Sequence, residues 1–425
     1  MHRVLLDISP LRRHRDFRLV FIGQLVSAFG SFFTYVAIPV QIYELTGSSA
    51  IVGLLGTAQL VPLAFAALWG GAFADALDRR ALLLRCEALM TCGSLALVVN
   101  ALLPHPSVVV VFVVAAFLSA VNGFHRPALE AITQKLVAFD ELRAVSALTS
   151  LRGTTAAIAG PALAGVCIAA FGLAATYVVE VATFAISLVA LWAIRSMPPA
   201  EHAQPAGLNT ILEGLRYAAS RSELLGTYAV DILAMTFAMP MAIFPALAQQ
   251  FGGAYAVGYL YSAMSLGALL MTVFSAWTRR VERHGAAVIV AAMLWGCAIF
   301  ALGFAQSLPV AIVCLMAAGA ADMVSGLFRM TIWNETIPST IRGRMAGIEQ
   351  LSYMTGPLLG NARAGFAAER FGLARSIASG GLLCVACVGA CVPLLPAFWR
   401  YRKPAAPPVE STALPRAVDA KGSED

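Results

Sequence analysis

Twelve apolar stretches follow one another along the chain, and each is long enough to cross a lipid bilayer as a helix of about 20 residues. Only 12% of the residues are charged, whereas soluble domains carry about 25%. Because lipid cannot hydrogen-bond to exposed backbone groups, segments of this length cross it as helices. We therefore predict an all-α integral membrane protein with twelve transmembrane helices. The predicted spans lie near 18–44, 49–72, 81–103, 107–125, 144–170, 174–194, 223–249, 254–277, 285–304, 308–330, 343–367 and 373–397.

The basic residues lie almost entirely on one side of these spans. All but four of the 29 Lys and Arg residues fall at the span ends or in the loops on the side of the N-terminus; the exceptions are Arg152, Arg363, Arg370 and Arg375. Cytoplasmic loops are enriched in Lys and Arg, which predicts a multi-pass protein of the inner membrane with both termini in the cytoplasm. The net charge of +6 is spread over many loops and so indicates no nucleic-acid partner.

A long polar segment separates the first six spans from the last six. It begins rich in Pro and Ala and becomes amphipathic, with Ile211, Leu212 and Leu215 on one face, which predicts contact with the membrane surface. The predicted organisation is a cytoplasmic N-terminus (1–17), an N-terminal six-helix bundle (18–194), a cytoplasmic linker (195–222), a C-terminal six-helix bundle (223–397) and a disordered cytoplasmic tail (398–425).

The two halves repeat each other at one place. PALAGVCIAAFGLA (161–174) aligns with NARAGFAAERFGLA (361–374) at an offset of 200 residues, which pairs Gly165 with Gly365 and Gly172 with Gly372. Together with the linker at the midpoint, this match predicts two six-helix pseudo-repeats. Two similar halves can rock around a site between them and expose it to either side of the membrane, so the pattern favours transport by alternating access.

A charged loop lies between the second and third spans. Its sequence GGAFADALDRR (70–80) resembles the signature of the major facilitator superfamily, with Gly71, Asp75, Asp78, Arg79 and Arg80 at the glycine, acidic and basic positions. The resemblance implies that Asp75 and Arg79 help to hold a conformational gate. We expect Asp75 and Asp78 to pair with basic groups or helix N-termini when the cytoplasmic face is closed. Arg79 and Arg80 should anchor the turn in the cytoplasm.

Further motifs lie in the fifth and eleventh spans. RGTTAAIAGPALAG (152–165) resembles the helix 5 motif of the proton-coupled exporters of this superfamily, although its ending is less rich in glycine. The motif residues of the two spans are Gly160, Pro161, Gly165, Gly356 and Pro357. Within the superfamily, five stretches resemble the branch that holds enterobactin (siderophore) exporters and macrolide efflux proteins. They are LRRHRDFRLVFIGQLVS, VAIPVQIYELTGSS, NALLPHPS, GYLYSAMSLGA and GRMAGIEQLSYMTGPLLG.

Polar side chains inside the spans are functional candidates, because they are costly in lipid. The first span carries a polar stripe at helical spacing: Gln24, Ser27, Ser31, Thr34 and Tyr35. Such a stripe either lines an aqueous cavity or packs against another helix through hydrogen bonds. The resemblance places helices 1, 4, 7 and 10 around a cavity and favours lining. The other cavity or substrate candidates are Asn122, His125, Arg152 and Arg329. His125, near a predicted helix end, is either a titrating group or a solvated one.

Three carboxyl groups are candidates for proton coupling. A buried carboxyl group favours its neutral form, so it can bind and release a proton during turnover. Asp231, about 12 Å into the seventh span, is the first choice, and Glu180 lies about 9 Å into the sixth. The alternative for Asp231 is a structural pairing with Arg152 or another buried donor. Asp322, about 20 Å from the outer end of the tenth span, suits a gate or an Asp–Arg pair better than a midplane proton carrier.

Several other classes of function are disfavoured. The eight cysteines lie within spans, and Cys384, Cys387 and Cys391 have no His or acidic partner on their helix, so we expect packing residues and no metal site. The sequence has no GxxxxGK[ST] phosphate loop, which argues against an ATP-driven pump. No catalytic constellation appears, so we expect neither an enzyme nor a cofactor.

These observations predict a secondary active transporter that exports a siderophore or another bulky amphipathic small molecule by alternating access, in exchange for protons. A macrolide or multidrug efflux pump and a non-transporting membrane sensor are the alternatives. Uptake also stays open, because topology does not set the direction of transport. The expected partners are the small molecule, protons and membrane lipid, and the chain is expected to be a monomer.

Overall fold

The computed structural model describes residues 7–196, 208–338 and 341–403; the side chains of residues 67–76, 134, 208–212, 342–344, 346–347 and 350 lie outside that description. The predicted linker and tail therefore fall partly outside it. All regular secondary structure in the described residues is helical. Among them, ten helical segments are long and apolar enough to cross a membrane, judged by length and composition.

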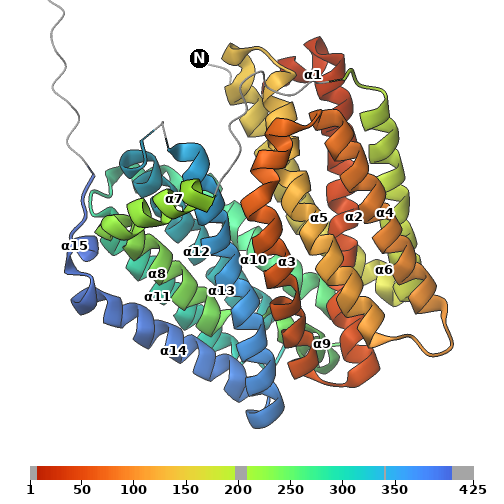
Figure 1. Cartoon of the computed structure of the whole chain (residues 1–425). Coiled ribbons are helices and arrows are strands. Elements are labelled where there is room, and N and C mark those ends of the chain that lie inside the picture. Colours follow the sequence, from red (N-terminus) through yellow and green to blue (C-terminus); the bar gives the residue numbers. More distant parts are fainter. Residues whose placement is uncertain (1–6, 197–207, 339–340, 404–425) are drawn as a thin grey trace, which may run out of the picture.

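The first half of the chain forms one group of helices (Figure 1). Its helices are α1 (Ser9–Arg13), α2 (Arg15–Thr46), α3 (Ser49–Ala76), α4 (Arg79–Leu102), α5 (Val108–Lys135), the 3-10 turn η1 (Phe139–Glu141) and α6 (Leu142–Trp192). Within this half, α2 packs along α6 and α3 along α5, while α4 contacts both α5 and α6.

The second half forms the other group. Its helices are α7 (Leu208–Ser220), α8 (Ser222–Ala238), η2 (Met241–Ile243), α9 (Phe244–Gln250), α10 (Ala254–Val273), η3 (Ser275–Arg280), α11 (His284–Leu302), α12 (Leu308–Thr336), α13 (Arg342–Phe371), α14 (Leu373–Leu394) and α15 (Pro396–Trp399). The amphipathic part of the predicted linker is helix α7, which contacts α8 and α13.

Two glycines mark equivalent bends in the halves. Gly172 interrupts α6 with φ 80° and ψ 177°, and Gly372 separates α13 from α14 with φ 88° and ψ 158°. This backbone conformation is open to glycine and strained for residues with a Cβ atom. Dividing α6 at Gly172 and adding α13 yields, within the described residues, the twelve long helical segments that the sequence predicts.

One predicted helix is broken. The span predicted at 223–249 is helix α8, the short turn η2 and helix α9. Pro240 lies at the break and has no backbone N–H to continue the helical ladder. The side-chain oxygen of Asn361 on α13 accepts a hydrogen bond from the backbone N–H of Ala242, at 3.0 Å. The break therefore has a specific partner, and the predicted span consists of two helices joined by a short turn.

The halves meet at the end of the molecule that lies away from the N-terminus, and they diverge at the other end (Figure 1). One hydrophobic core, with members such as Ile38, Leu55, Ala164 and Leu260, joins the two halves. Towards the N-terminal end, each half has a separate core: one packs around Leu83 and Ile132, the other around Trp333.

Glycines allow the halves to approach closely. A Cβ atom at Gly165 on α6 would lie 2.8 Å from the backbone of Gly258 on α10. In the same way, a Cβ atom at Gly53 on α3 would lie 2.5 Å from the carbonyl oxygen of Asn361 on α13, and Gly365 faces the backbone of Ser49. Small residues of this kind permit close helix packing in membranes. The two contacts are equivalent under the internal repeat, since Gly165 and Gly365 are its paired positions.

Candidate functional site

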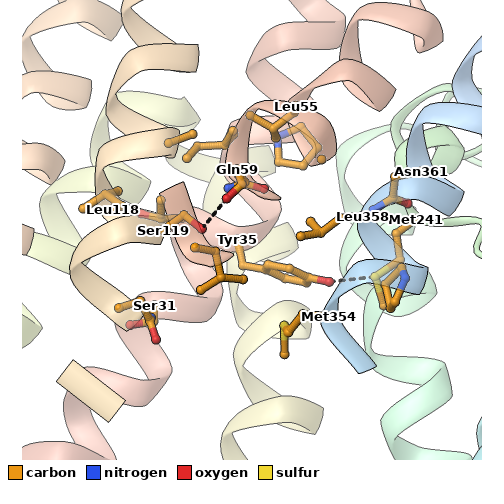
Figure 2. Close-up of a pocket in the computed structure, with 18 of the residues that line it drawn as sticks. Ser31, Tyr35, Leu55, Gln59, Leu118, Ser119, Met241, Met354, Leu358 and Asn361 are labelled. Carbon is orange, nitrogen blue, oxygen red and sulfur yellow. Dashed lines mark hydrogen bonds between the residues drawn. The ribbon is translucent and has the colours of Figure 1, made fainter. Parts of the chain in front are cut away.

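A cavity of about 500 Å³ lies between the two halves (Figure 2). Its walls come mainly from α2, α3 and α5 of the first half and from η2 and α13 of the second. The volume lies within the range of about 300–1,000 Å³ that is typical of small-molecule sites. Its lining is largely apolar, with a few polar groups, which suits a bulky amphipathic ligand.

The two halves contact each other at the wall of this cavity. The hydroxyl of Tyr35 on α2 donates to the sulfur of Met241, at 2.6 Å (Figure 2). The Tyr35 ring also packs edge-on against Tyr261 on α10, with ring centroids 5.5 Å apart. Tyr261 in turn donates a hydrogen bond to the carbonyl of Met241. These contacts join α2 of the first half to η2 and α10 of the second.

The polar lining includes residues that the sequence argument missed. Gln59 on α3 and Ser119 on α5 line the cavity, and the Ser119 hydroxyl donates to the Gln59 carbonyl (Figure 2). Asn361 lines it from α13 and Arg126 from α5. A polar residue within an apolar stretch was the available signal for Gln59, whereas Arg126 was assigned to a loop because the fourth span was expected to end at residue 125.

The predicted polar stripe of the first helix serves both of the purposes considered. Ser31, Thr34 and Tyr35 line the cavity. Gln24 and Ser27 are buried and lie outside the lining, and Gln24 donates hydrogen bonds to Glu87 and Ser187. Gln24, at the N-terminal part of the stripe, therefore follows the packing alternative, because it meets helices α4 and α6.

Of the remaining cavity candidates, some line the cavity and others do not. Asn122 lines the cavity, whereas His125, Arg152 and Arg329 do not belong to the lining. His125 is buried, because α5 continues to Lys135 and places it well inside the helix. Arg329 is buried for the same reason, because α12 continues to Thr336. The expectation of a solvated His125 near a helix end was therefore wrong.

Glu180 is a buried carboxylate at the wall of the cavity. Its Oε2 atom accepts hydrogen bonds from the hydroxyl of Ser94 on α4, at 2.6 Å, and from that of Thr34 on α2. Both bonds go to one oxygen, so Oε1 is the atom that can face the cavity. Neutral donors hold Glu180, and a proton on it would leave no buried cation unpaired.

Asp231 has a different environment. Its carboxylate forms an ion pair with Arg329 on α12, and Arg329 also lies 3.5 Å from Asp322 on the same helix. The three residues correspond to the structural alternative considered for Asp231, with Arg329 in place of Arg152. Asp322 lies on the face of α12 that carries Ser325, and both line a small cavity beside Asp231.

A further buried carboxylate, Glu87 on α4, was not recognised in the sequence. Its Oε1 atom accepts hydrogen bonds from Gln24 at 2.6 Å and from Ser187 at 3.0 Å, and it lies 3.1 Å from Nε2 of His125. The Glu87 side chain is fully buried. In the sequence, Glu87 is one acidic residue near the start of the third span, and nothing beside it indicates a buried site. Its partners come from three other helices, so only the tertiary structure brings them together.

The charged loop between α3 and α4 is described in part. The side chains of Gly71 and Asp75 lie outside the described residues. Asp78 caps α4 by accepting from the backbone N–H of Ala81, and it also accepts from the hydroxyl of Ser196. Arg80 donates to the carbonyls at the end of α6, of which Leu191 lies at 3.0 Å. These bonds tie α4 to the end of α6 within one half.

The residues of the helix 5 and helix 11 motifs lie at close contacts between helices. Gly160 on α6 faces Phe32 on α2, and Gly356 on α13 faces Met235 on α8. Pro161 and Pro357 both lie inside their helices, and Pro357 lines the cavity. Together with Gly165, these residues allow packing at distances that a side chain would prevent.

The segment after α14 packs across the second half, at the end that lies nearest the N-terminus of the chain. Phe398 on α15 is fully buried against Gly226 of α8 and Gly285 of α11. The hydroxyl of Tyr401 lies 3.1 Å from the Glu335 carboxylate. Burial raises the pKa of the Tyr401 hydroxyl above its ordinary value.

The chain has recognisable relatives. The sequence profile of the family described as transmembrane secretion effectors matches residues 7–410. The enterobactin exporter EntS of Shigella boydii serotype 18 is 30% identical over 386 residues, which covers 90% of this chain and 92% of that protein. The enterobactin exporter EntS of Escherichia coli strain SMS-3-5 is 29% identical with the same coverage.

Solved transporters share the fold. A POT family transporter in complex with 5-aminolevulinic acid superposes with a TM-score of 0.70 at 12% identity, over 91% of this chain and 97% of that one. The nucleoside transporter NupG superposes with a TM-score of 0.63 at 17% identity, over 89% of this chain and 98% of that one. At such low identity, these matches establish a common helical architecture.

Proposed function

This chain belongs to the transmembrane secretion effector family of the major facilitator superfamily, and we propose that it exports a siderophore or another bulky amphipathic small molecule. The observation that carries the proposal is the largely apolar cavity between the two halves, where Tyr35 contacts Met241 and Tyr261 of the opposite half. The named activity of its relatives, enterobactin export, supplies the substrate class.

Alternating access follows from how the halves meet. In the described residues, the core residues that join the halves and the close glycine contacts between them lie at one end, and separate cores lie at the other. We propose that the diverging end faces the cytoplasm, in keeping with the basic residues at that end, so the conformation is the one that loads substrate from inside. Rocking about the cavity would then open the Tyr35 side.

Proton antiport is the proposed source of energy. Of the three sequence candidates, Glu180 suits this role best, because it lies at the cavity wall and neutral donors hold it. Asp231 and Asp322 share the fixed positive charge of Arg329, and we assign them to an ion-pair cluster within the second half. We also propose that Asp75 and Arg79 help to hold a conformational gate.

The proposed setting is the inner membrane, with both termini in the cytoplasm, lipid around the helices and a monomeric chain. A multidrug efflux pump is the second candidate. Methionines line the cavity from both halves: Met90, Met239, Met241 and Met354. Flexible, polarizable methionine side chains adapt to ligands of different shape, which favours a pump of broad specificity.

Export can be tested in iron-starved cells of the source organism. Deleting the gene should retain the siderophore inside the cells, and a plasmid copy should restore its secretion. Proteoliposomes with the purified full chain then test directly whether enterobactin accumulates in response to a pH gradient. Unchanged siderophore secretion, together with export of unrelated amphipathic drugs, would favour the multidrug reading.

A further inference from the structure

Two buried carboxylates, Glu180 and Glu87, each connect the same three helices of the first half. Glu180 accepts from Ser94 on α4 and Thr34 on α2, whereas Glu87 accepts from Ser187 on α6 and Gln24 on α2. Ser94 follows Glu87 by seven residues on α4, and Ser187 follows Glu180 by seven residues on α6. The same three helices thus meet at two levels, separated by two helical turns, or about 10 Å.

The level that lies nearer the N-terminal end holds an incompletely paired carboxylate. The Glu87 contacts to Gln24, Ser187 and His125 all go to Oε1. The other oxygen, Oε2, is buried and has no hydrogen-bond partner among the described residues. A bare carboxylate oxygen in a buried site is unfavourable, and a bound proton removes that cost, because a neutral carboxyl group is far easier to bury.

The partner of Glu87 can itself change charge. An imidazole exists in a neutral and a charged form, whereas the guanidinium beside Asp231 is always charged. His125 lies one helical turn from Asn122 and next to Arg126, and both of these line the cavity. A change of charge at the Glu87–His125 pair would therefore act directly beside the substrate site.

In the described residues, the other charged groups on the four helices around this pair form no ion pair with Glu87. His125 is the ionisable group in contact with Glu87 in the described part of the chain. Arg126 pairs with Glu130 on α5, while Asp16 near the start of α2 lies beside Arg195 at the end of α6. The remaining charged residues of these helices are Arg15 and Arg18 on α2, Glu44 at its far end, Arg79, Arg80 and Arg85 on α4, Lys135 on α5, and Arg143, Arg152 and Glu180 on α6.

We propose that Glu87 and His125 form the proton-binding site that couples export to the proton gradient, with Glu180 as its partner at the cavity wall. This inference rests on the proposed exporter function. The pair binds one proton in the conformation open to the outside and releases it on the cytoplasmic side when substrate enters the cavity. One proton crosses the membrane in each cycle. An O–H bond on Glu87 or an N–H bond on His125 forms when the proton binds, and the same bond breaks when the proton is released.

Proteoliposomes with the purified full chain test the assignment, with enterobactin as the probe. Glu87→Gln keeps a side-chain acceptor for Gln24 and Ser187 but cannot bind a proton. We expect accumulation driven by a pH gradient to fall at least tenfold, while counterflow exchange of enterobactin without a gradient stays within twofold of the unmodified protein. Asp140→Asn removes an exposed carboxylate on η1 and is the matched control, expected to leave both measurements unchanged.

His125→Gln provides a second test that does not require the Glu87 variant to fold, and the same loss of gradient-driven accumulation is expected. Infrared titration reads protonation without transport: a carboxyl C=O band that changes with pH in the unmodified protein should be missing in Glu87→Gln. Gradient-driven accumulation by both variants at the normal rate, or an unchanged infrared band, would overturn the assignment. If the unmodified protein neither accumulates nor exchanges enterobactin while the band titrates, the substrate proposal has failed and the proton site stands.

Discussion

The carboxylate of Asp231 on α8 forms an ion pair with the guanidinium of Arg329 on α12, and both side chains are buried in the second half of the molecule. Asp322 lies 3.5 Å from the same guanidinium and is more exposed. Removing one partner of a buried pair leaves an uncompensated buried charge, whereas removing both here leaves only the more exposed Asp322 without a cation. The Asp231–Arg329 pair therefore behaves as a structural connection between α8 and α12.

Neutralising this pair should reveal that role. Arg329→Gln leaves two carboxylates without a cation and should lower the free energy of unfolding by about 3–5 kcal/mol. Asp231→Asn leaves Arg329 beside Asp322 and should cost less. The double variant Asp231→Asn/Arg329→Gln should recover most of the loss, as measured by thermal unfolding in detergent. If the double variant folds but loses its dependence on the pH gradient, Asp231 is a coupling residue after all.

A large side chain at Gly165 should disrupt the contact between the two halves. A Cβ atom there already meets the backbone of Gly258, so Gly165→Leu forces α6 and α10 apart. We expect transport to fall more than tenfold while the amount of protein in the membrane stays the same. Gly153→Leu on the same helix is the control, because a Cβ atom at Gly153 meets open space. Equal activity of the two variants would show that close packing at Gly165 is dispensable.

Phe398 should contribute strongly to stability. Its ring is fully buried against Gly226 on α8, and truncating a buried aromatic side chain costs about 3–5 kcal/mol. Phe398→Ala should therefore lower the melting temperature markedly, whereas Arg400→Ala, at an exposed position nearby, should have little effect. Similar melting temperatures for the two variants would mean that α15 does not hold the second half together.

Tyr401 should make stability sensitive to alkaline pH. Burial raises the pKa of its hydroxyl above the ordinary value of 10.0, so the folded chain keeps the proton at a pH where the unfolded chain loses it. The resulting stability is fully present below about pH 10 and is lost as the pH rises through the folded pKa. The melting temperature of the unmodified protein should exceed that of Tyr401→Phe at pH 8, and this difference should shrink above pH 10. A constant difference would contradict the burial of the ionisable hydroxyl.

The internal repeat could be read from residue identities alone, because the same local geometry requires the same residue. Gly172 and Gly372 share a positive φ that only glycine adopts easily, and Gly165 and Gly365 share a close contact between the halves. The helices themselves follow from long apolar stretches, since lipid satisfies no exposed backbone groups. These features depend on short segments of chain, so the sequence displays them directly.

The ends of the helices were harder to predict from the sequence than the helices themselves. An apolar window ends where polar residues begin, but α5 and α12 continue past that point because neighbouring helices cover their polar faces. His125, Arg126 and Arg329 consequently lie inside helices, where they meet a carboxylate, the cavity and an ion-pair partner respectively.

By itself, the sequence determined the helical membrane fold, the duplication and the family motif, because hydrophobic length and glycine geometry are local properties. Only the tertiary structure decided which polar side chains meet. Glu87 is an ordinary acidic residue in the sequence, and it becomes a candidate proton site because Gln24, His125 and Ser187 reach it from three other helices. Asp231 was the more conspicuous carboxylate, and the packing of α8 against α12 gave it a permanent counter-charge.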